Sequence, residues 1–372
     1  MIEPIMRALA MALAMGWEIL WPLILGFALS AVVQAAVSHQ QMSQLLPDDR
    51  PRSIATALVL GAASSSCSYA AVALARSIFR KGAHFTAAMA FEMASTNLVF
   101  ELSIIMVALL GWQLTLAEFV GAPLMIVLLV LLFRTFLTHD LLEQAKEQAD
   151  KGLVGRMEGH AEMDMSVTEG GSFWRRMTSD RGLTAISHYF VMDWAAVWLD
   201  IVGGLLIAGA LAAWVPNTFW QSFFLAGHPV LSTLWGPIVG PLAAVLWNGG
   251  ISFGGVIAFI FADLIVIPIL NIYRKYYGLK MAGFLFATFY VAMAIAALIV
   301  DLIFRGFALI PSEPSARVVE ASIAWNYTTC LNLAFLVLAG LLVWRFLKTG
   351  GPAMLRMMNR PANHGGAHHH AA

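Results

Sequence analysis

Charged residues are scarce in this sequence. Only 12% of its 372 residues are Asp, Glu, Lys or Arg, against about 25% in soluble domains. The 22 basic and 22 acidic residues give a formal net charge of zero, so bulk charge indicates neither nucleic acid nor another polyanion as a partner. The only two cysteines are Cys67 and Cys330. They are too far apart in sequence for a CxxC metal site, and two cysteines are too few for a disulfide framework.

Nucleotide and metal motifs are also missing. The sequence contains neither a GxxxxGK phosphate loop nor an HExxH zinc motif, which argues against ATP binding of the P-loop kind and against a zinc protease. The histidines near the C-terminus and in the central hydrophilic stretch are more typical of solvated segments than of metal sites. We therefore predict no metal site and no cofactor.

What the sequence has instead is long apolar runs. Hydrophobic residues make up 60% of the chain, and the mean hydropathy is +0.76. Runs of about 20 apolar residues are typical of membrane-spanning helices. We predict an all-α polytopic membrane protein with about seven spanning helices, near residues 9–37, 84–111, 116–137, 189–215, 253–273, 280–304 and 321–347. The first run continues to Val37, so it is predicted as an uncleaved helix rather than a signal peptide.

Two further apolar runs, 54–80 and 220–250, are interrupted near their middle by polar, Gly or Pro residues. Irregular backbone at membrane depth survives only where protein or a water-filled cavity surrounds it, and such breaks often form transporter substrate sites. The alternative is a Ser-rich helix whose hydroxyls bond to its own carbonyls, which would give eight or nine full spans. The candidate substrate-binding residues at the two breaks and on the segment after the first are Ser64, Ser65, Ser66, Cys67, Ser68, Asn97, Gly236 and Pro237.

The two halves of the chain look related. Ala90-Phe91-x-x-Ala94 recurs as Ala258-Phe259-x-x-Ala262 at an offset of 168 residues, and the two interrupted runs fall opposite one another at the same offset. If both interrupted runs are re-entrant hairpins, the basic residues near 50, 80, 274–280 and 345–360 lie on one side, as the positive-inside rule requires. The halves then have opposite orientations, which is an inverted repeat. With nine full spans, the later basic residues would lie outside.

The predicted organisation follows from these segments. Residues 1–137 form a first membrane half with its broken hairpin at 54–80, and 138–187 form a hydrophilic cytoplasmic linker. Residues 188–348 form the second half with its broken hairpin at 220–250 and a final helix, and 349–372 form a flexible tail on the cytoplasmic side.

Three acidic residues lie inside apolar runs: Glu92, Glu101 and Asp263. A carboxylate inside a membrane is costly and is usually kept for proton or ion transfer, so we assign all three to ion or proton coupling. Asp263 precedes Pro268, where a helix kink is expected. The alternatives are that Glu92 is a structural partner of Arg76 or Arg80 and that Asp263 makes an interhelical hydrogen bond. Asp193, Asp200 and Asp301 are weaker candidates, because each is placed nearer a helix end.

Two stretches, SSSCSYAAVALARSIFRKGAHFTAAMAFEMASTNLVFE and ISFGGVIAFIFADLIVIPILNIYRKYYGLKMAGFLFATFY, resemble the bacterial family of predicted permeases that includes the organoarsenical efflux permease. The resemblance covers about 17–344 except the linker. It implies an efflux carrier of the bacterial inner membrane with trivalent organoarsenicals as the best-known substrate class. It also places Cys67 in the cysteine-containing hairpin motif of the family. Related permeases carry a cysteine motif in both halves, whereas here Trp235 stands opposite Cys67, and two cysteines cannot form a three-thiol arsenic site.

The favoured hypothesis is a secondary, proton-coupled efflux transporter of a small thiophilic solute. Its expected partners are that solute and the lipid bilayer, with homo-oligomerisation left open. The first alternative is a channel, or a membrane subunit that relies on a separate energy-supplying partner. The second is a membrane enzyme with Cys67 as nucleophile, for which no partner histidine is evident. We therefore do not expect an enzyme.

Overall fold

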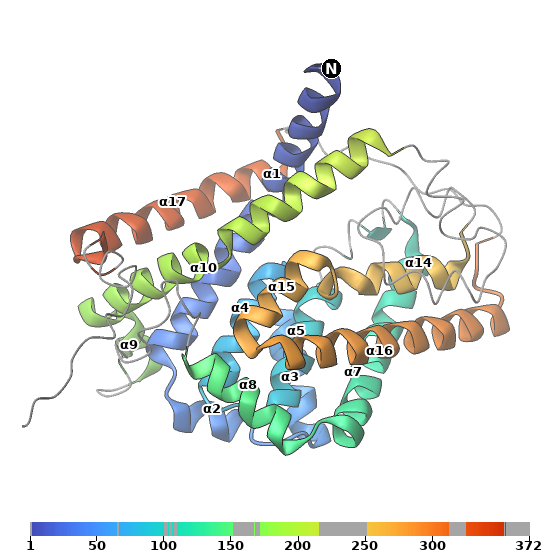
Figure 1. The fold of residues 1–372 in the computed structure, drawn as a ribbon, viewed down its shortest axis with the longest axis horizontal. Helices are drawn as coiled ribbons and strands as arrows, with labels where there is room; N and C mark the ends of the chain where they lie inside the picture. Colours follow the sequence, from blue (N-terminus) through green and yellow to red (C-terminus); the bar gives the residue numbers. More distant parts are fainter. Residues whose placement is uncertain are drawn as a thin grey trace, which may run out of the picture.

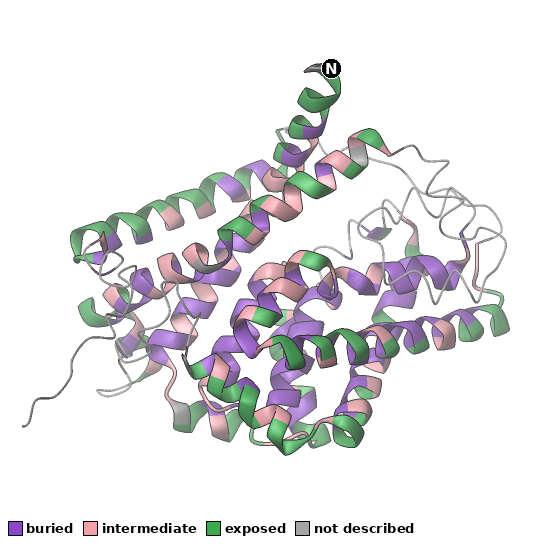
Figure 2. Ribbon diagram, in the orientation of Figure 1, coloured by how far each residue is buried: buried purple, intermediate pink, exposed green. Residues whose placement is uncertain are grey.

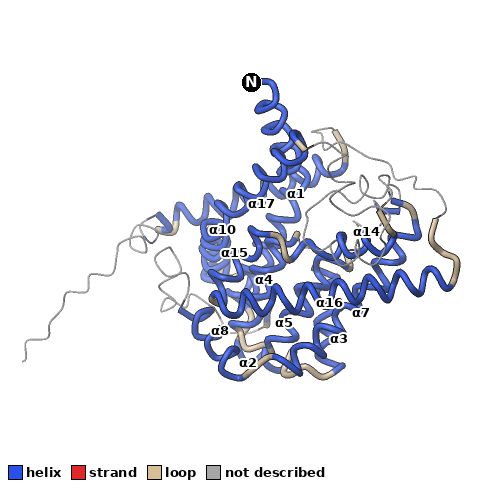
Figure 3. Tube along the Cα trace, turned by 45° about the vertical axis from the view of Figure 1, so that its right-hand side comes forward, coloured by secondary structure: helices blue, strands red, loops and turns tan. Residues whose placement is uncertain are grey.

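Helices make up the described structure, a computed structural model that describes residues 2–64, 67–99, 103, 106–107, 110–151, 167, 172–215, 251–311, 325–352 and 354. No strand occurs in those ranges (Figure 3). The elements are α1 (Ile2–Ala36), α2 (His39–Leu45), α3 (Pro51–Ser64), α4 (Ser68–Arg80), α5 (Phe85–Asn97), α7 (Trp112–Phe136), α8 (His139–Lys151), α9 (Phe173–Thr178), α10 (Asp180–Trp214), α14 (Phe253–Ile260), the 3-10 helix η2 (Phe261–Leu264), α15 (Ile267–Tyr277), α16 (Leu279–Gly306) and α17 (Tyr327–Lys348) (Figure 1).

Five segments are long and apolar enough to cross a membrane: α1, α7, α14 to α15, α16 and α17. A sixth is α10, which bends by 44° between Ala195 and Val197. These match six of the seven predicted spans. The seventh, 84–111, is not one continuous helix, because α5 ends at Asn97 with an irregular C-cap at Leu98. The protein is therefore a helical multi-pass membrane protein, with five to six candidate spans among the described residues.

Helices α3 and α4 form a hairpin around the Ser-rich break. The backbone N–H of His84, just after α4, donates to the carbonyl of Leu46, just before α3, at 2.8 Å, so both ends of the hairpin lie on the same side. An α-helix rises about 1.5 Å per residue, so neither limb spans a hydrocarbon core of about 30 Å. A chain that enters and leaves on one side agrees with the predicted re-entrant geometry.

Helix α5 lies against the hairpin and forms the centre of the molecule. Every residue of α5 is buried, polar ones included (Figure 2), which confirms that neither polar face of this segment meets lipid. The close approach depends on Gly61 of α3, where a Cβ would lie 2.5 Å from the carbonyl oxygen of Phe91 and 2.8 Å from the Cβ of Ala94. A helix that is buried on all sides needs such a shell of neighbours.

Two helices of the N-terminal part of the chain pack against two helices of the C-terminal part in antiparallel pairs. In the first pair, the indole N–H of Trp214 at the end of α10 donates to the carbonyl of Pro4 at the start of α1 at 3.0 Å. In the second pair, the rings of Phe133 near the end of α7 and Phe284 near the start of α16 are 5.3 Å apart. Antiparallel packing of matching helices is the arrangement that an inverted repeat produces.

The same backbone feature precedes α7 and α16. Gly111 has φ 92° and ψ 160°, and Gly278 has φ 87° and ψ 164°, as the N-cap residues of these helices. A positive φ strongly favours glycine, so the two halves share a glycine-specific turn at a matching position. This correspondence was not visible as a motif in the sequence.

Pro268 does not kink a continuous helix as predicted. The chain changes from α14 to η2, leaves helical geometry at Ile265 and Val266, and starts α15 with Pro268 in its first turn. Proline fits the first turn because its missing N–H would have no intrahelical partner there. Asp263 therefore lies in a short 3-10 segment at a break between two helices.

Part of the predicted hydrophilic linker is folded. Helix α8 occupies its start and buries Ala145 and Ala149, and α10 begins at Asp180 rather than at 189. Gln148 donates to the carbonyl of Lys275 at 3.2 Å, which ties α8 to the end of α15. The α8 side of the molecule, defined by α2, α8, α9 and residues 46–50, also holds the ends of α4, α7 and α17 (Figure 1). Basic residues on this side include Arg50, Arg52, Arg80, Lys81, Arg134, Lys146, Arg175, Arg176, Arg274, Lys275, Lys280, Arg345 and Lys348.

An ion pair fixes α7 to this side. The guanidinium of Arg134 donates to Asp49 through Nε at 2.6 Å and to the Asp49 carbonyl through Nη2 at 2.8 Å. The hydrogen bond from Arg134 holds the pKa of Asp49 below its ordinary value. The pair therefore stays charged at neutral pH and anchors the segment before α3.

Asn332 of α17 inserts its side chain into a turn of α1. Its amide donates to the carbonyl of Trp17 at 2.7 Å and accepts from the N–H of Trp21 at 2.9 Å. These two backbone groups would bond to each other in an uninterrupted helix. Pro22 follows directly and cannot donate to the preceding turn, so the bonds from Asn332 reinforce α1 next to a missing helix hydrogen bond.

We expect Asn332→Ala to lower the apparent melting temperature of the detergent-solubilised protein. Two buried hydrogen bonds are lost, at a cost of about 1–3 kcal/mol for a buried group left without a partner. Cys330→Ala on the same helix serves as the control, because Cys330 is exposed. Equal melting of both variants would show that the inserted amide contributes nothing.

Candidate functional site

Three acidic side chains from three elements lie in the interior of the bundle. Glu92 of α5 is 0% exposed and Glu118 of α7 is 4% exposed, while Asp263 of η2 is half-buried. One carboxylate oxygen of each has no hydrogen-bond partner: Oε2 of Glu92, Oε2 of Glu118 and Oδ1 of Asp263. No basic side chain of the described residues pairs with any of the three. Buried acids without a cationic partner are costly, and in membrane proteins they mark proton or ion pathways.

The hairpin tip contacts the second half at Asp263. Ser68, the first residue of α4, donates its hydroxyl to Oδ2 of Asp263 at 2.7 Å. The N-terminus of α4 carries the positive end of the helix dipole, which favours an anion beside it. The predicted Ser68 and Asp263 are thus brought together, and the two halves meet at the break in each.

Glu92 bonds to the second half as well. Tyr273 of α15 donates its hydroxyl to Oε1 of Glu92. The alternative that Glu92 pairs with Arg76 or Arg80 is wrong, because Arg76 stacks over the Tyr276 ring at 4.3 Å and donates to the carbonyl of Ala149 at 3.1 Å. Glu92 therefore retains one free oxygen and a single neutral donor.

Cys67 is the N-cap residue of α4, next to Ser68, and its thiol is free and half-buried. Cys330 lies on the exposed side of α17, so the two thiols belong to different parts of the molecule. The hydroxyl of Ser64 donates to the carbonyl of Gly61 at 2.7 Å. This agrees with the alternative that the serines of this run bond to carbonyls of their own helix. A single half-buried thiol at the tip can offer one soft ligand.

Asn97 is placed close to the tip but bonds within its own helix. Its amide donates to the carbonyl of Met93 at 3.1 Å and to the Thr96 hydroxyl at 2.9 Å. The hydroxyl of Ser95 likewise donates to the carbonyl of Glu92. The other predicted site residues lie outside the described residues: Ser65, Ser66, Glu101, Gly236 and Pro237, with the second hairpin at 220–250.

The sequence reasoning missed Glu118 and Tyr273. In the sequence, Glu118 is near the start of the apolar run 116–137. In the structure it lies on the buried stripe of α7. A signal was present, since Glu118 precedes Pro123 by the same spacing as Asp263 precedes Pro268. Tyr273 could not be found from sequence, because only tertiary packing brings α15 against α5.

Asp193 is also better buried than predicted. Its Oδ2 accepts from Ser30 at 2.7 Å and from Gln34 at 3.0 Å, both on α1, and Ser30 is 2.8 Å from the Ser77 hydroxyl of α4. Asp193 is 5% exposed, so it is not a helix-end residue that water reaches. This cluster joins α1, α4 and α10 and gives its acid two donors, whereas Glu92 and Asp263 each have one.

The sequence GISFG matches the GxSxG pattern around the nucleophile of many serine hydrolases, with Ser252 at the serine position. Its hydroxyl accepts from the N–H of Gly255 at 3.1 Å and so caps α14. A hydrolase of this class places the serine on a strand-to-helix turn, whereas Ser252 precedes a helix in an all-helical region. The serine is therefore explained as a helix cap.

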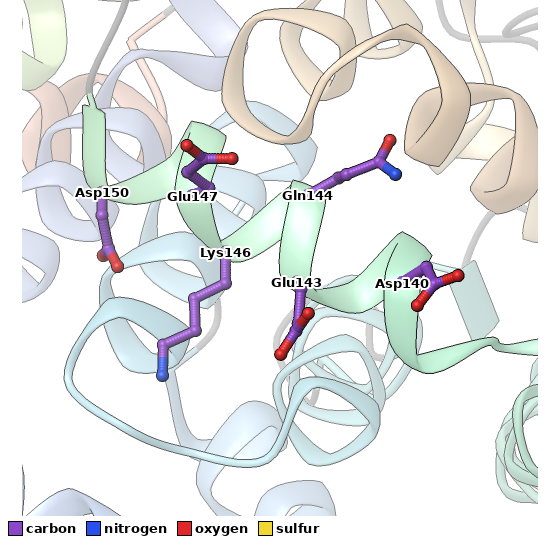
Figure 4. A pocket seen from close by; sticks show the side chains of 6 residues that line it. All are labelled: Asp140, Glu143, Gln144, Lys146, Glu147 and Asp150. Atoms are coloured by element: carbon purple, nitrogen blue, oxygen red, sulfur yellow. The ribbon is translucent and has the colours of Figure 1, made fainter.

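The measurable hollows lie away from the acids. A surface hollow of about 530 Å³ is lined by α8 alone, with Asp140, Glu143, Gln144, Lys146, Glu147 and Asp150 (Figure 4). An apolar groove of about 220 Å³ lies between α1, α10 and α17. Among the described residues, no group of three His, Cys, Asp or Glu side chains could hold a metal ion.

Comparison with known proteins gives a consistent result. Residues 4–302 match a family described as predicted permeases. A protein named "Putative permease Rv2963" from Mycobacterium tuberculosis is 60% identical over 337 residues, which cover 87% of this chain and 83% of that protein. No solved structure matches the chain.

Proposed function

We propose, from the premise that this chain belongs to the predicted permease family, that it is a proton-coupled secondary efflux transporter of a small solute. Membership supports a membrane transporter. The observation that carries the finer proposal is the contact of Ser68 with Asp263 at the junction of the two halves. Acids without a basic partner surround this contact, and their charge can change only by binding a proton or a cationic ligand.

The two halves are proposed to be inverted repeats, with residues 1–137 and 188–348 as the halves. The antiparallel pairs α1 with α10 and α7 with α16 support this, as do the matching turns at Gly111 and Gly278. In such transporters one half moves against the other around a central site. Because Ser68 and Asp263 belong to different halves, a change in the charge of Asp263 would alter the contact between them.

The α8 side is proposed to be cytoplasmic, with the bacterial inner membrane as the location. The basic residues gathered on that side support the assignment through the positive-inside rule. Residues 138–187 and the C-terminus then face the cytoplasm, and the N-terminus lies outside. The α3–α4 hairpin enters from the cytoplasmic side, and its tip reaches the middle of the membrane.

The substrate class proposed is a thiophilic solute, with a trivalent organoarsenical as the first probe. Cys67 supports this proposal, because its thiol lies at the hairpin tip beside the Ser68–Asp263 contact. A thiol binds soft metalloids well. A single thiol gives weak binding compared with a three-thiol site, and weak binding suits a carrier that must release its load.

The test is uptake of phenylarsine oxide into inverted membrane vesicles energised with a proton gradient. The proteins compared are wild type, Glu92→Gln, Cys67→Ser and, as a matched control, Glu143→Gln on the exposed face of α8. Wild-type uptake should vanish with a protonophore and with Glu92→Gln but persist with Glu143→Gln. Loss with Cys67→Ser would add the thiol to the site.

Three results would each overturn a part of the proposal. Uptake that ignores the protonophore but requires ATP would favour the alternative of a membrane subunit with an energy-supplying partner. Uptake that follows only the solute gradient and tolerates Glu92→Gln would favour a channel. Uptake of non-thiophilic solutes alone would remove arsenicals as the substrate.

A further inference from the structure

Glu118 is a buried acid for which the fold shows no structural role. It lies on the core-facing stripe of α7 with Leu114, Gly121 and Met125, and it is 4% exposed. Its Oε2 is buried without a hydrogen-bond partner, and no ion pair or hydrogen bond to its side chain is found among the described residues. An acid that only stabilises the fold would have a donor or a cation beside it.

Helix α7 is pressed against the element that carries Asp263. A Cβ on Gly121, one turn from Glu118, would lie 2.4 Å from the Phe261 ring of η2 and 3.2 Å from Val300 of α16. Phe261 is two residues before Asp263 in η2, so this contact brings the part of α7 that carries Glu118 against the element of Asp263. Helix α5, which carries Glu92, also contacts η2.

The helices also set the order of the three acids across the membrane. Distances from the α8 side follow from the rise of about 1.5 Å per residue. On this basis Glu92 lies about 10 Å along α5 from its start on the α8 side. Asp263 faces the start of α4, about 18 Å along that helix from its end on the α8 side. Glu118 lies about 24 Å along α7 from Arg134, which is on the α8 side. Glu118 is thus the acid farthest from the α8 side.

Among the described residues, the elements around α7 offer no other free titratable group. Glu92 is the one acid of α5, Asp263 is that of η2, and α14 has none. On α16, Asp301 pairs with Arg305 at 2.7 Å and accepts from the N–H of Gly254 at 3.0 Å. The two remaining titratable side chains of α16 are accounted for elsewhere: Lys280 donates to Gln144, and Tyr290 stacks on Phe286.

We propose that Glu118 is the outer proton-binding carboxyl of the transporter and exchanges its proton with Asp263, and through Asp263 with Glu92. The proposal rests on the proposed proton coupling and adds the acid on the side opposite α8. In an exporter driven by protons from outside, Glu118 is then the first of the three to receive the proton. The proton moves between carboxyl oxygens, and no bond to carbon changes.

The first test needs no substrate. Infrared difference spectra of the reconstituted protein are recorded between acidic and alkaline pH for wild type, Glu118→Gln, Glu118→Asp and the control Glu143→Gln. The carbonyl band of protonated carboxyl groups should lose one component in Glu118→Gln, keep a shifted component in Glu118→Asp and stay unchanged in Glu143→Gln. A wild-type spectrum in Glu118→Gln would overturn the proposal, because Glu118 would then not change its protonation.

The second test separates this inference from the proposed function. Phenylarsine oxide flux into proteoliposomes is measured both as proton-driven uptake and as exchange at equal pH. Glu118→Gln should lower the driven uptake about tenfold or more, the factor that about 1.4 kcal/mol represents, and should leave exchange intact. Equal loss of both would overturn the outer role of Glu118. Absence of any wild-type flux would instead count against the proposed function, and the infrared result would still decide whether Glu118 binds a proton.

Discussion

Replacing Asp263 by Asn is expected to abolish proton-driven transport while the protein stays folded. The amide keeps the shape of the side chain and can still accept from Ser68, but it cannot bind and release a proton. Proton-driven flux should therefore fall at least tenfold, the factor that about 1.4 kcal/mol represents. Because Asp263 has no basic partner, neutralising it leaves no unpaired cation behind, and the apparent melting temperature should not fall.

Asp301→Asn is the matched control for this prediction. Asp301 is the same residue type in the same half, but it accepts from the N–H of Gly254 and pairs with Arg305. Its substitution should therefore lower the melting temperature and leave flux per folded molecule nearly unchanged. If Asp263→Asn transports normally, Asp263 does not couple protons to transport. If Asp263→Asn unfolds while Asp301→Asn stays folded, Asp263 is a structural residue.

Gly61→Ala is expected to lower the apparent melting temperature more than any other substitution that adds one methyl group to the α3–α4 hairpin. The new Cβ would lie 2.5 Å from the Phe91 carbonyl oxygen and 3.1 Å from the Ser95 nitrogen, and backbone atoms of α5 cannot rotate away. Overpacking of this kind costs about 1–3 kcal/mol, and the cost here should lie at the upper end. Since α3 and α5 must separate, the Ser68–Asp263 contact should be disturbed as well.

The control for Gly61→Ala is Gly283→Ala on α16. Gly283 is exposed, and a Cβ there would meet nothing within 4 Å. Alanine in an exposed helix interior is more favourable than glycine by about 1 kcal/mol, so this variant should melt at the same temperature or higher. Equal melting of the two variants would show that the α3–α5 contact is looser than the structure indicates.

The sequence by itself determined the class of protein and several site residues. Long apolar runs can satisfy their backbone in a bilayer only as helices, so the helical membrane fold and six of the spans followed from composition alone. The cost of a carboxylate in hydrocarbon singled out Glu92 and Asp263, and the distribution of basic residues favoured a re-entrant first hairpin. None of these inferences requires knowing which helices touch.

Tertiary structure alone decided the partners and the breaks. Ser68 and Asp263 are 195 residues apart in sequence, and no local pattern reports that they meet. The end of α5 at Asn97, the start of α15 at Ile267 and the folded α8 depend on neighbours that replace water around the backbone. Glu118 was missed for the same reason: an acid near the start of an apolar run is cheap if it faces water and costly if it faces the core, and only packing decides which.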